Sequence, residues 1–160
     1  NLVIRKHFGD LELRACKTQQ LKLGGNAFKD IKEVRQFALS LTKKLDGFKF
    51  PTHMPSYLVE NYGQQVVVIL DQWSDRNPTE DPELSLLKSE VLFCMRYEMV
   101  CSLQDFFARR TGLINFDIHK VNRWKAAIAD ACKEYLHWDD QKVQEELQAL
   151  NSLIAAVRNF

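Results

Sequence analysis

The feature that most restricts the fold of this chain is the helical spacing of its apolar residues. Over most of the 160 residues, apolar positions recur three and four residues apart, as expected for one face of an α-helix. Alternation with a period of two is nearly absent, apart from two short pieces that could be extended, Leu11 to Leu13 and Leu21 to Leu23. The pattern predicts an all-α protein.

The first half of the chain contains signals for three helices. The first helix is expected between Asn26, a possible cap, and Gly47, a possible stop, and its buried face would hold Phe28, Ile31, Val34, Ala38, Leu41 and Leu45. A second is expected between Thr52, as its cap, and Gly63, which ends "YLVENYG". The stretch "QQVVVILDQW" predicts the third. The segment "SDRNPTEDPE" that follows has the prolines and acidic residues of a solvated connector.

The second half predicts four further helices by the same criteria. One covers roughly residues 87–100, and the next begins at Ser102, because Ser102 and Asp105 have the spacing of a capping box. Asp117 can cap a long helix and Asp139 can cap the last one.

Length and composition favour a single domain. The chain is 46% hydrophobic, which is enough for one compact core at this length. We therefore expect a single orthogonal helical bundle of about six or seven helices over residues 26–160. Residues 1–25 are expected to form a short irregular or extended connector. Because the sequence begins with Asn1 rather than methionine, we expect it to be a piece of a longer chain.

Charge and cysteine content exclude several kinds of partner. The formal net charge is +1, which provides no long-range field to attract nucleic acid. The four cysteines form no C-x-x-C pair, which favours reduced thiols and a cytoplasmic location. Apolar runs such as Val66–Leu70 are far shorter than the ~20 residues of a membrane-spanning helix.

Residues that could carry chemistry are scattered. The four histidines lie in different segments, without the i, i+4 spacing that predicts a metal site: His7, His53, His119 and His137. Gly24-Gly25 lacks a phosphate-binding pattern. Cys94 and Cys101 are expected on the inward face of one helix, where cysteine behaves as a small hydrophobe. We therefore predict no catalytic, cofactor-binding or metal site in this chain.

An arginine occupies a position where the helical pattern expects an apolar residue. Leu103, Phe106 and Phe107 form one stripe, and its next position is Arg110. Glu98 falls on the inward stripe of the preceding helix, between Cys94 and Cys101. Because a guanidinium cannot lose its charge, we predict a bidentate structural ion pair between Glu98 and Arg110 or, failing that, Arg109. The alternative is that both arginines point outward.

The same region carries a resemblance to a known family. "RYEMVCSLQDFFARRTGLINFD" resembles the stretch R-x-E-[LM]-x-x-[ST]-x-x-D-x-[LF]-x-R-R-T in the C-terminal domain of the FAD-dependent glycerol-3-phosphate dehydrogenases and α-glycerophosphate oxidases. "CKTQQLKLGG", "YLVENYG" and "YLHWDDQKVQEEL" are also similar to segments of that domain. The resemblance thus covers nearly the whole chain.

The resemblance implies an accessory role within a flavoenzyme. The family's helical cap domain packs on a flavin-binding domain of the same chain, which oxidises sn-glycerol 3-phosphate to dihydroxyacetone phosphate by hydride transfer to FAD. The family's catalytic and FAD-binding residues lie in that other domain, so we expect this fragment alone to bind no cofactor and to be inactive. Arg109, turned about 100° from Arg110, is a candidate for docking on the flavin domain.

Several alternatives stay open at this point. Electrons could pass to quinone, with peripheral contact of the full-length protein at the cytoplasmic membrane face, or to oxygen. A freestanding helical interaction or regulatory module is the alternative function. We also expect an apolar surface patch larger than a monomer usually exposes, through which the isolated domain could form a homo-oligomer.

Overall fold

The structure is a computed structural model that describes residues 6–7, 28–48, 50–74 and 79–158. Apart from residues 6 and 7, the connector predicted over residues 1–25 lies outside these ranges. The two extended pieces predicted near residues 11–13 and 21–23, and the cap predicted at Asn26, are likewise outside them.

The described residues fold into α-helices joined by short turns, and no strand occurs among them, which confirms the all-α prediction. Seven α-helices and two shorter helical turns follow one another along the described chain: α2 (Ile31–Leu45), α3 (Met54–Tyr62), η2 (Gly63–Gln65), α4 (Val66–Ser74), α5 (Pro82–Tyr97), η3 (Asp105–Arg110), α6 (Leu113–Phe116), α7 (Ile118–Leu136) and α8 (Asp140–Arg158).

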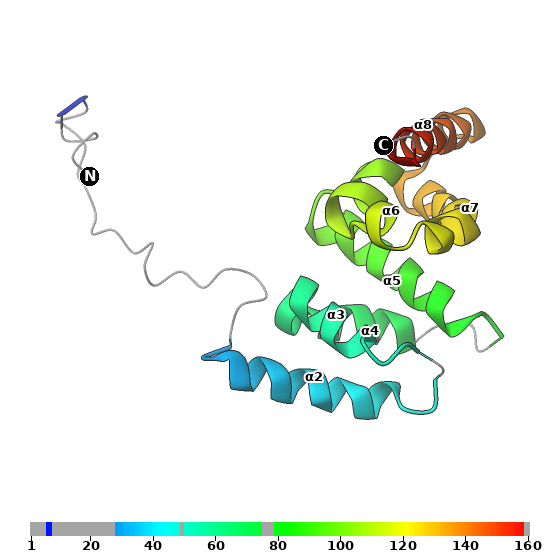
Figure 1. The fold of residues 1–160 in the computed structure, drawn as a ribbon. Coiled ribbons are helices and arrows are strands. Elements are labelled where there is room, and N and C mark those ends of the chain that lie inside the picture. Colours follow the sequence, from blue (N-terminus) through cyan, green and yellow to red (C-terminus); the bar gives the residue numbers. More distant parts are fainter. Residues whose placement is uncertain (1–5, 8–27, 49, 75–78, 159–160) are drawn as a thin grey trace.

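The helices stack from one end of the molecule to the other. Figure 1 shows α2 along one edge, beside α3 and α4, with α5 crossing the middle and α7 and α8 at the far end. A single apolar cluster connects these layers, and its largest fully buried side chains include Phe93, Phe106 and Phe107. Within the described residues, no helix combines the length and the apolar character needed to cross a membrane.

Several of the predicted helix boundaries are confirmed. The backbone N–H of Lys120 donates to Asp117 at the start of α7, and that of Lys142 donates to Asp139 at the start of α8. Gly63 ends α3 with a φ of 56°, a conformation that glycine adopts at little cost. Thr52 is not the cap of α3, because His53 occupies that position and makes no side-chain capping bond.

The boundaries of α5 differ most from the prediction. The helix begins at Pro82 because Asp81, in the presumed connector, accepts hydrogen bonds from the N–H groups of Glu83 and Leu84. It ends at Tyr97 rather than near residue 100. Glu98 is its C-cap, and Met99 follows in a left-handed conformation, with φ 56°. The inward stripe therefore stops before Cys101, which is exposed instead of buried.

The helix predicted from Ser102 is a π-helical turn for most of its length. The Ser102 hydroxyl accepts the N–H of Asp105, as predicted, at 3.0 Å. Asp105–Arg110 then adopts the wider i to i+5 pattern, in which the Thr111 N–H donates to the Phe106 carbonyl. This turn places Phe106 and Phe107 in the core and positions Arg110 at its end.

Candidate functional site

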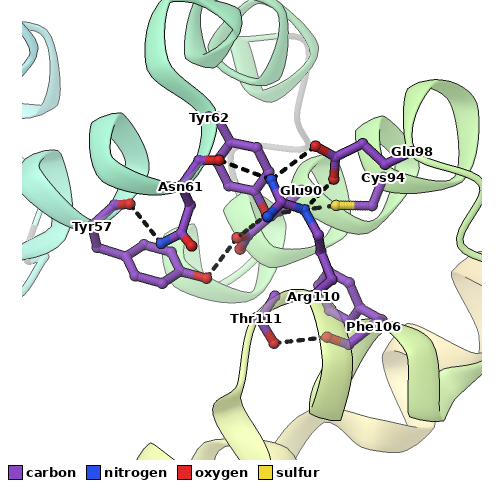
Figure 2. Close-up of polar contacts among 9 residues, drawn as sticks. All are labelled: Tyr57, Asn61, Tyr62, Glu90, Cys94, Glu98, Phe106, Arg110 and Thr111. Atoms are coloured by element: carbon purple, nitrogen blue, oxygen red, sulfur yellow. Dashed lines mark hydrogen bonds and ion pairs between the residues drawn. The ribbon is translucent and has the colours of Figure 1, made fainter. Parts of the chain in front are cut away.

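The most densely connected polar group in the described residues is the cluster shown in Figure 2, which we call the α3–α5 polar cluster. It consists of residues from α3, the C-terminal half of α5 and the end of η3: Tyr57, Asn61, Tyr62, Glu90, Cys94, Glu98 and Arg110. The side chains point toward one another between these elements, as Figure 2 shows. The cluster contains both members of the ion pair predicted from the sequence.

The structure brings Arg110 and Glu98 together. The Arg110 Nε donates to one oxygen of the Glu98 carboxylate, and Nη2 donates to the other at 2.8 Å. Nη2 also donates to the backbone carbonyl of Asn61 at 2.9 Å. One guanidinium therefore connects the C-cap of α5 to the last turn of α3. Glu98 reaches it from beyond the end of α5, and not from the inward stripe where the sequence pattern placed it.

The environment of this ion pair is half-buried. The side chains of Arg110 and Glu98 are each 25% exposed, and the guanidinium carbon lies 4.5 Å from the centre of the Tyr62 ring. Burial opposes the charged form of Arg110, but the hydrogen bond to Glu98 and the nearby negative groups raise its pKa above the ordinary value. Arg110 thus keeps its charge in a partly desolvated position.

Glu90 is the buried carboxylate of the cluster. Its carboxylate is 3% exposed, and its Oε1 accepts hydrogen bonds from the hydroxyls of Tyr57, at 2.7 Å, and Tyr62, at 2.6 Å. Burial raises the pKa of Glu90, whereas the two tyrosine hydrogen bonds and the charges of Lys120 and Arg110 lower it; the net direction is upward.

The remaining groups of the cluster stay protonated near neutral pH. Burial, together with the neighbouring Glu90 carboxylate, raises the pKa of both Tyr57 and Tyr62. Burial also raises the pKa of Cys94 to about 12, and the Cys94 sulfur lies 3.5 Å from the Tyr62 hydroxyl. A thiol with this pKa is a poor nucleophile. The polar groups of the cluster thus bond to one another and connect α3, α5 and η3.

Glu90, Tyr57 and Tyr62 were not predicted as site residues from the sequence. The signal for Glu90 was present, because it follows Leu87 by three residues and precedes Cys94 by four, which places it on the inward face of α5. The two tyrosines that satisfy it come from α3, about 30 residues away in the sequence. Their pairing with Glu90 depends on the tertiary fold, which the periodicity does not specify.

Arg109 and the histidines lie apart from the cluster. Arg109 pairs with Asp105 one turn earlier, and its side chain is 70% exposed. The histidines are all exposed, in separate segments. Across the described ranges, no three His, Cys, Asp or Glu side chains form a group that could hold a metal ion.

A second buried carboxylate, Glu146 on α8, supports the turn that carries Arg110. Its Oε2 accepts the backbone N–H of Leu103 at 3.0 Å, and its Oε1 contacts Lys142 Nζ at 2.8 Å. A side chain distant in sequence thus caps the helical turn that starts after Ser102. This contact was not predicted from the sequence.

The fold and the α3–α5 polar cluster together define a class of protein. It is an all-α module in which a buried polar cluster joins neighbouring helices. The sequence pattern of one family, the C-terminal domain of alpha-glycerophosphate oxidase, matches residues 16–143, well over half of the chain. The chain belongs to this family.

Individual relatives agree with that assignment. The aerobic glycerol-3-phosphate dehydrogenase of Bacillus subtilis (strain 168) is 27% identical over 152 residues, which cover 93% of this chain and 27% of the relative. The enzyme of the same name from Staphylococcus epidermidis is 24% identical over 156 residues, covering 97% of this chain and 28% of the relative. The chain therefore spans less than a third of these relatives' length.

A solved structure has the same fold. The glycerol-3-phosphate dehydrogenase from Bacillus halodurans, solved in complex with FAD, superimposes with a TM-score of 0.72. The match has 24% sequence identity and covers 88% of this chain and 29% of that one.

Proposed function

We propose that this chain is the C-terminal accessory domain of an FAD-dependent enzyme that oxidises sn-glycerol 3-phosphate to dihydroxyacetone phosphate. The observation that carries the proposal is the family match over residues 16–143, together with relatives that are named for this activity and are more than three times as long. The partner of the chain is then the flavin-binding domain of the same polypeptide.

The described residues support a structural role in that enzyme. The chain contains no G-x-G-x-x-G motif, and the polar residues of the α3–α5 polar cluster are already bonded to one another. These residues do not fit a flavin site, so the FAD is held by the rest of the polypeptide. The Arg110–Glu98 ion pair fixes the end of η3, and the exposed Arg109 beside it is available to contact the flavin domain.

The proposed cellular location follows from the proposed enzyme function. The full-length enzyme works in the cytoplasm. If quinone is its electron acceptor, its contact with the membrane is peripheral and involves parts of the polypeptide other than the described helices.

The test uses the full-length polypeptide that contains this domain. Purified protein should show the absorption of bound flavin and reduce an artificial quinone, or oxygen with release of peroxide, when sn-glycerol 3-phosphate is added. The 160-residue chain alone should be colourless and inactive in the same assays. A full-length protein without flavin, or with flavin but no oxidation of this substrate, would refute the proposal in favour of a freestanding interaction module or another flavoenzyme.

A further inference from the structure

Helix α2 has two large apolar side chains that remain exposed in the described structure. Its core face carries Leu41 and Leu45, which are buried. Leu39 lies on a different side of the helix and is 67% exposed. Ile31, in the first turn of α2, lies on the side of Leu45 but is 61% exposed, so the burial predicted for it from the sequence is wrong. Single exposed apolar side chains are ordinary, so these two become informative only through the groove that they border.

These residues border a groove between α2 and α3. The groove has a volume of about 510 Å³. Its apolar lining comes from both helices, with Val34 and Ala38 from α2 and Pro55 and Val59 from α3. Arg35 and Glu60, which have opposite charges, also line it. A groove lined by apolar residues, hydroxyl side chains and one charge of each sign suits a folded protein surface better than an anionic membrane or a nucleic acid.

We infer that the α2–α3 groove is the docking site for the preceding flavin-binding domain, which inserts an apolar helix or strand face into it. The inference rests on the proposed function, under which more than two thirds of the polypeptide precedes this domain. In the described bundle, α2 is the first helix, so it follows the preceding domain more closely in sequence than any other described helix does. The groove is therefore the apolar surface nearest in sequence to that domain.

The experiment measures cysteine labelling in the full-length protein. The variant Leu39→Cys places a thiol at the groove, and Ser40→Cys is the matched control. Ser40 is also exposed, but it follows Ala38 by two residues and so points about 200° around the helix from it, away from the groove. Rates of reaction with a water-soluble maleimide are read for each site by peptide mass spectrometry. We expect Leu39→Cys to react at least tenfold more slowly than Ser40→Cys in the folded protein, and equally fast in urea.

The outcomes separate the possible occupants. Similar rates at the two sites in the folded protein would overturn the inference. Protection at Leu39→Cys that disappears when the protein is diluted to a monomer, as judged by light scattering, would assign the groove to a second copy and also overturn it. Ile31→Cys provides an independent site at the same groove and should be protected in parallel.

Flavin content in the same samples distinguishes this inference from the proposed function. Bound flavin with rapid labelling at Leu39→Cys would refute the docking site and leave the function standing. Protection that persists in a monomer lacking flavin would refute the function, and with it the identity of the occupant as a flavin domain.

Discussion

Arg110 is the residue on which three elements converge, because its guanidinium bonds to Glu98 and to the carbonyl of Asn61 and lies over the Tyr62 ring. With a side chain 25% exposed, the pair lies between the exposed pairs that contribute under ~1 kcal/mol and the buried pairs that cost about 3–5 kcal/mol to break. We expect Arg110→Ala to lower the free energy of unfolding by about 1–3 kcal/mol, measured by urea denaturation.

Two further variants test whether this loss comes from the bidentate pair. Arg110→Lys should recover only part of the stability, since lysine keeps the charge but not the fork of donors. Arg109→Ala, at a 70% exposed neighbour, should change the stability by no more than about 0.5 kcal/mol. If Arg109→Ala and Arg110→Ala lowered the free energy of unfolding equally, the contact between Arg110 and Glu98 would contribute no specific stability.

Glu90 makes the stability depend on pH. Its pKa in the folded chain is raised above the ordinary 4.5, so its contribution to stability is fully present below that value and is lost as the pH rises through the folded pKa. Glu90→Gln removes this titration. We therefore expect the stability of the original chain relative to Glu90→Gln to fall as the pH rises above 4.5, as measured by denaturation at several pH values. The prediction would be contradicted if the difference in free energy of unfolding between the two chains stayed constant with pH, or if the original chain gained stability relative to Glu90→Gln as the pH rose.

The described cysteines should differ strongly in reactivity. Cys101 is exposed, whereas Cys94 and Cys132 are buried and have pKa values raised to about 12 by that burial. At pH 8 we expect a maleimide to label Cys101 at least 100-fold faster than the other two, because the thiolate is the nucleophile and must be accessible. Site-resolved mass spectrometry of the folded chain, with urea-unfolded chain as the control, measures this. Comparable labelling of Cys94 would show that α5 opens readily.

The helical turn that carries Arg110, η3, depends on a hydrogen bond to Glu146 of α8. Glu146→Ala leaves the buried N–H of Leu103 without an acceptor, and a lost capping bond of this kind costs about 1–2 kcal/mol. The measurement is urea denaturation monitored by circular dichroism. Glu145→Ala is the matched control, because Glu145 is the exposed neighbour on the same helix and bonds only to the side chain of Gln141 among the described contacts. If both variants lose the same stability, the cap is not the cause.

The sequence predicted most helices because their boundary signals are local. Asp117, Asp139 and Gly63 act within one turn of themselves, and the corresponding helix ends were predicted correctly. Asp81 carried an equally local signal that was missed, because its proline and acidic neighbours were interpreted as a solvated connector. Pro82 is in fact the first residue of α5, a position where its missing N–H costs nothing.

The polar cluster could be predicted only in part. The ion pair was inferred from a charge on an apolar stripe, but Glu98 was expected inside a helix that in fact ends one residue earlier. The π-helical pattern at Asp105–Arg110 and the left-handed Met99 decide where these groups point, and neither has a local sequence signal. Glu90 was missed because its partners come from another helix.

In the molecule as a whole, the apolar core and the α3–α5 polar cluster connect helices that are far apart in sequence. The apolar cluster includes residues from α2 through α8. The polar contacts join α3 to α5 and to the end of η3 across 28 to 49 residues. The bundle is therefore expected to behave as one unit that presents α2 at one end and α8 at the other (Figure 1).

The large sequence separation between Arg110 and Asn61 also affects the rates of folding and unfolding. Contacts within a helix or between consecutive helices close short loops and can form early, whereas the bond from Arg110 to Asn61 closes a loop of 49 residues. We expect that bond to form after the rate-limiting step. Arg110→Ala removes this bond together with the 12-residue contact to Glu98, whereas Glu98→Ala removes only the latter. The unfolding rate should therefore rise more in Arg110→Ala than in Glu98→Ala, while the refolding rates of the two variants should agree within about twofold, as measured by stopped-flow mixing with urea. A variant that mainly slows refolding would place the Arg110 clamp in the folding nucleus.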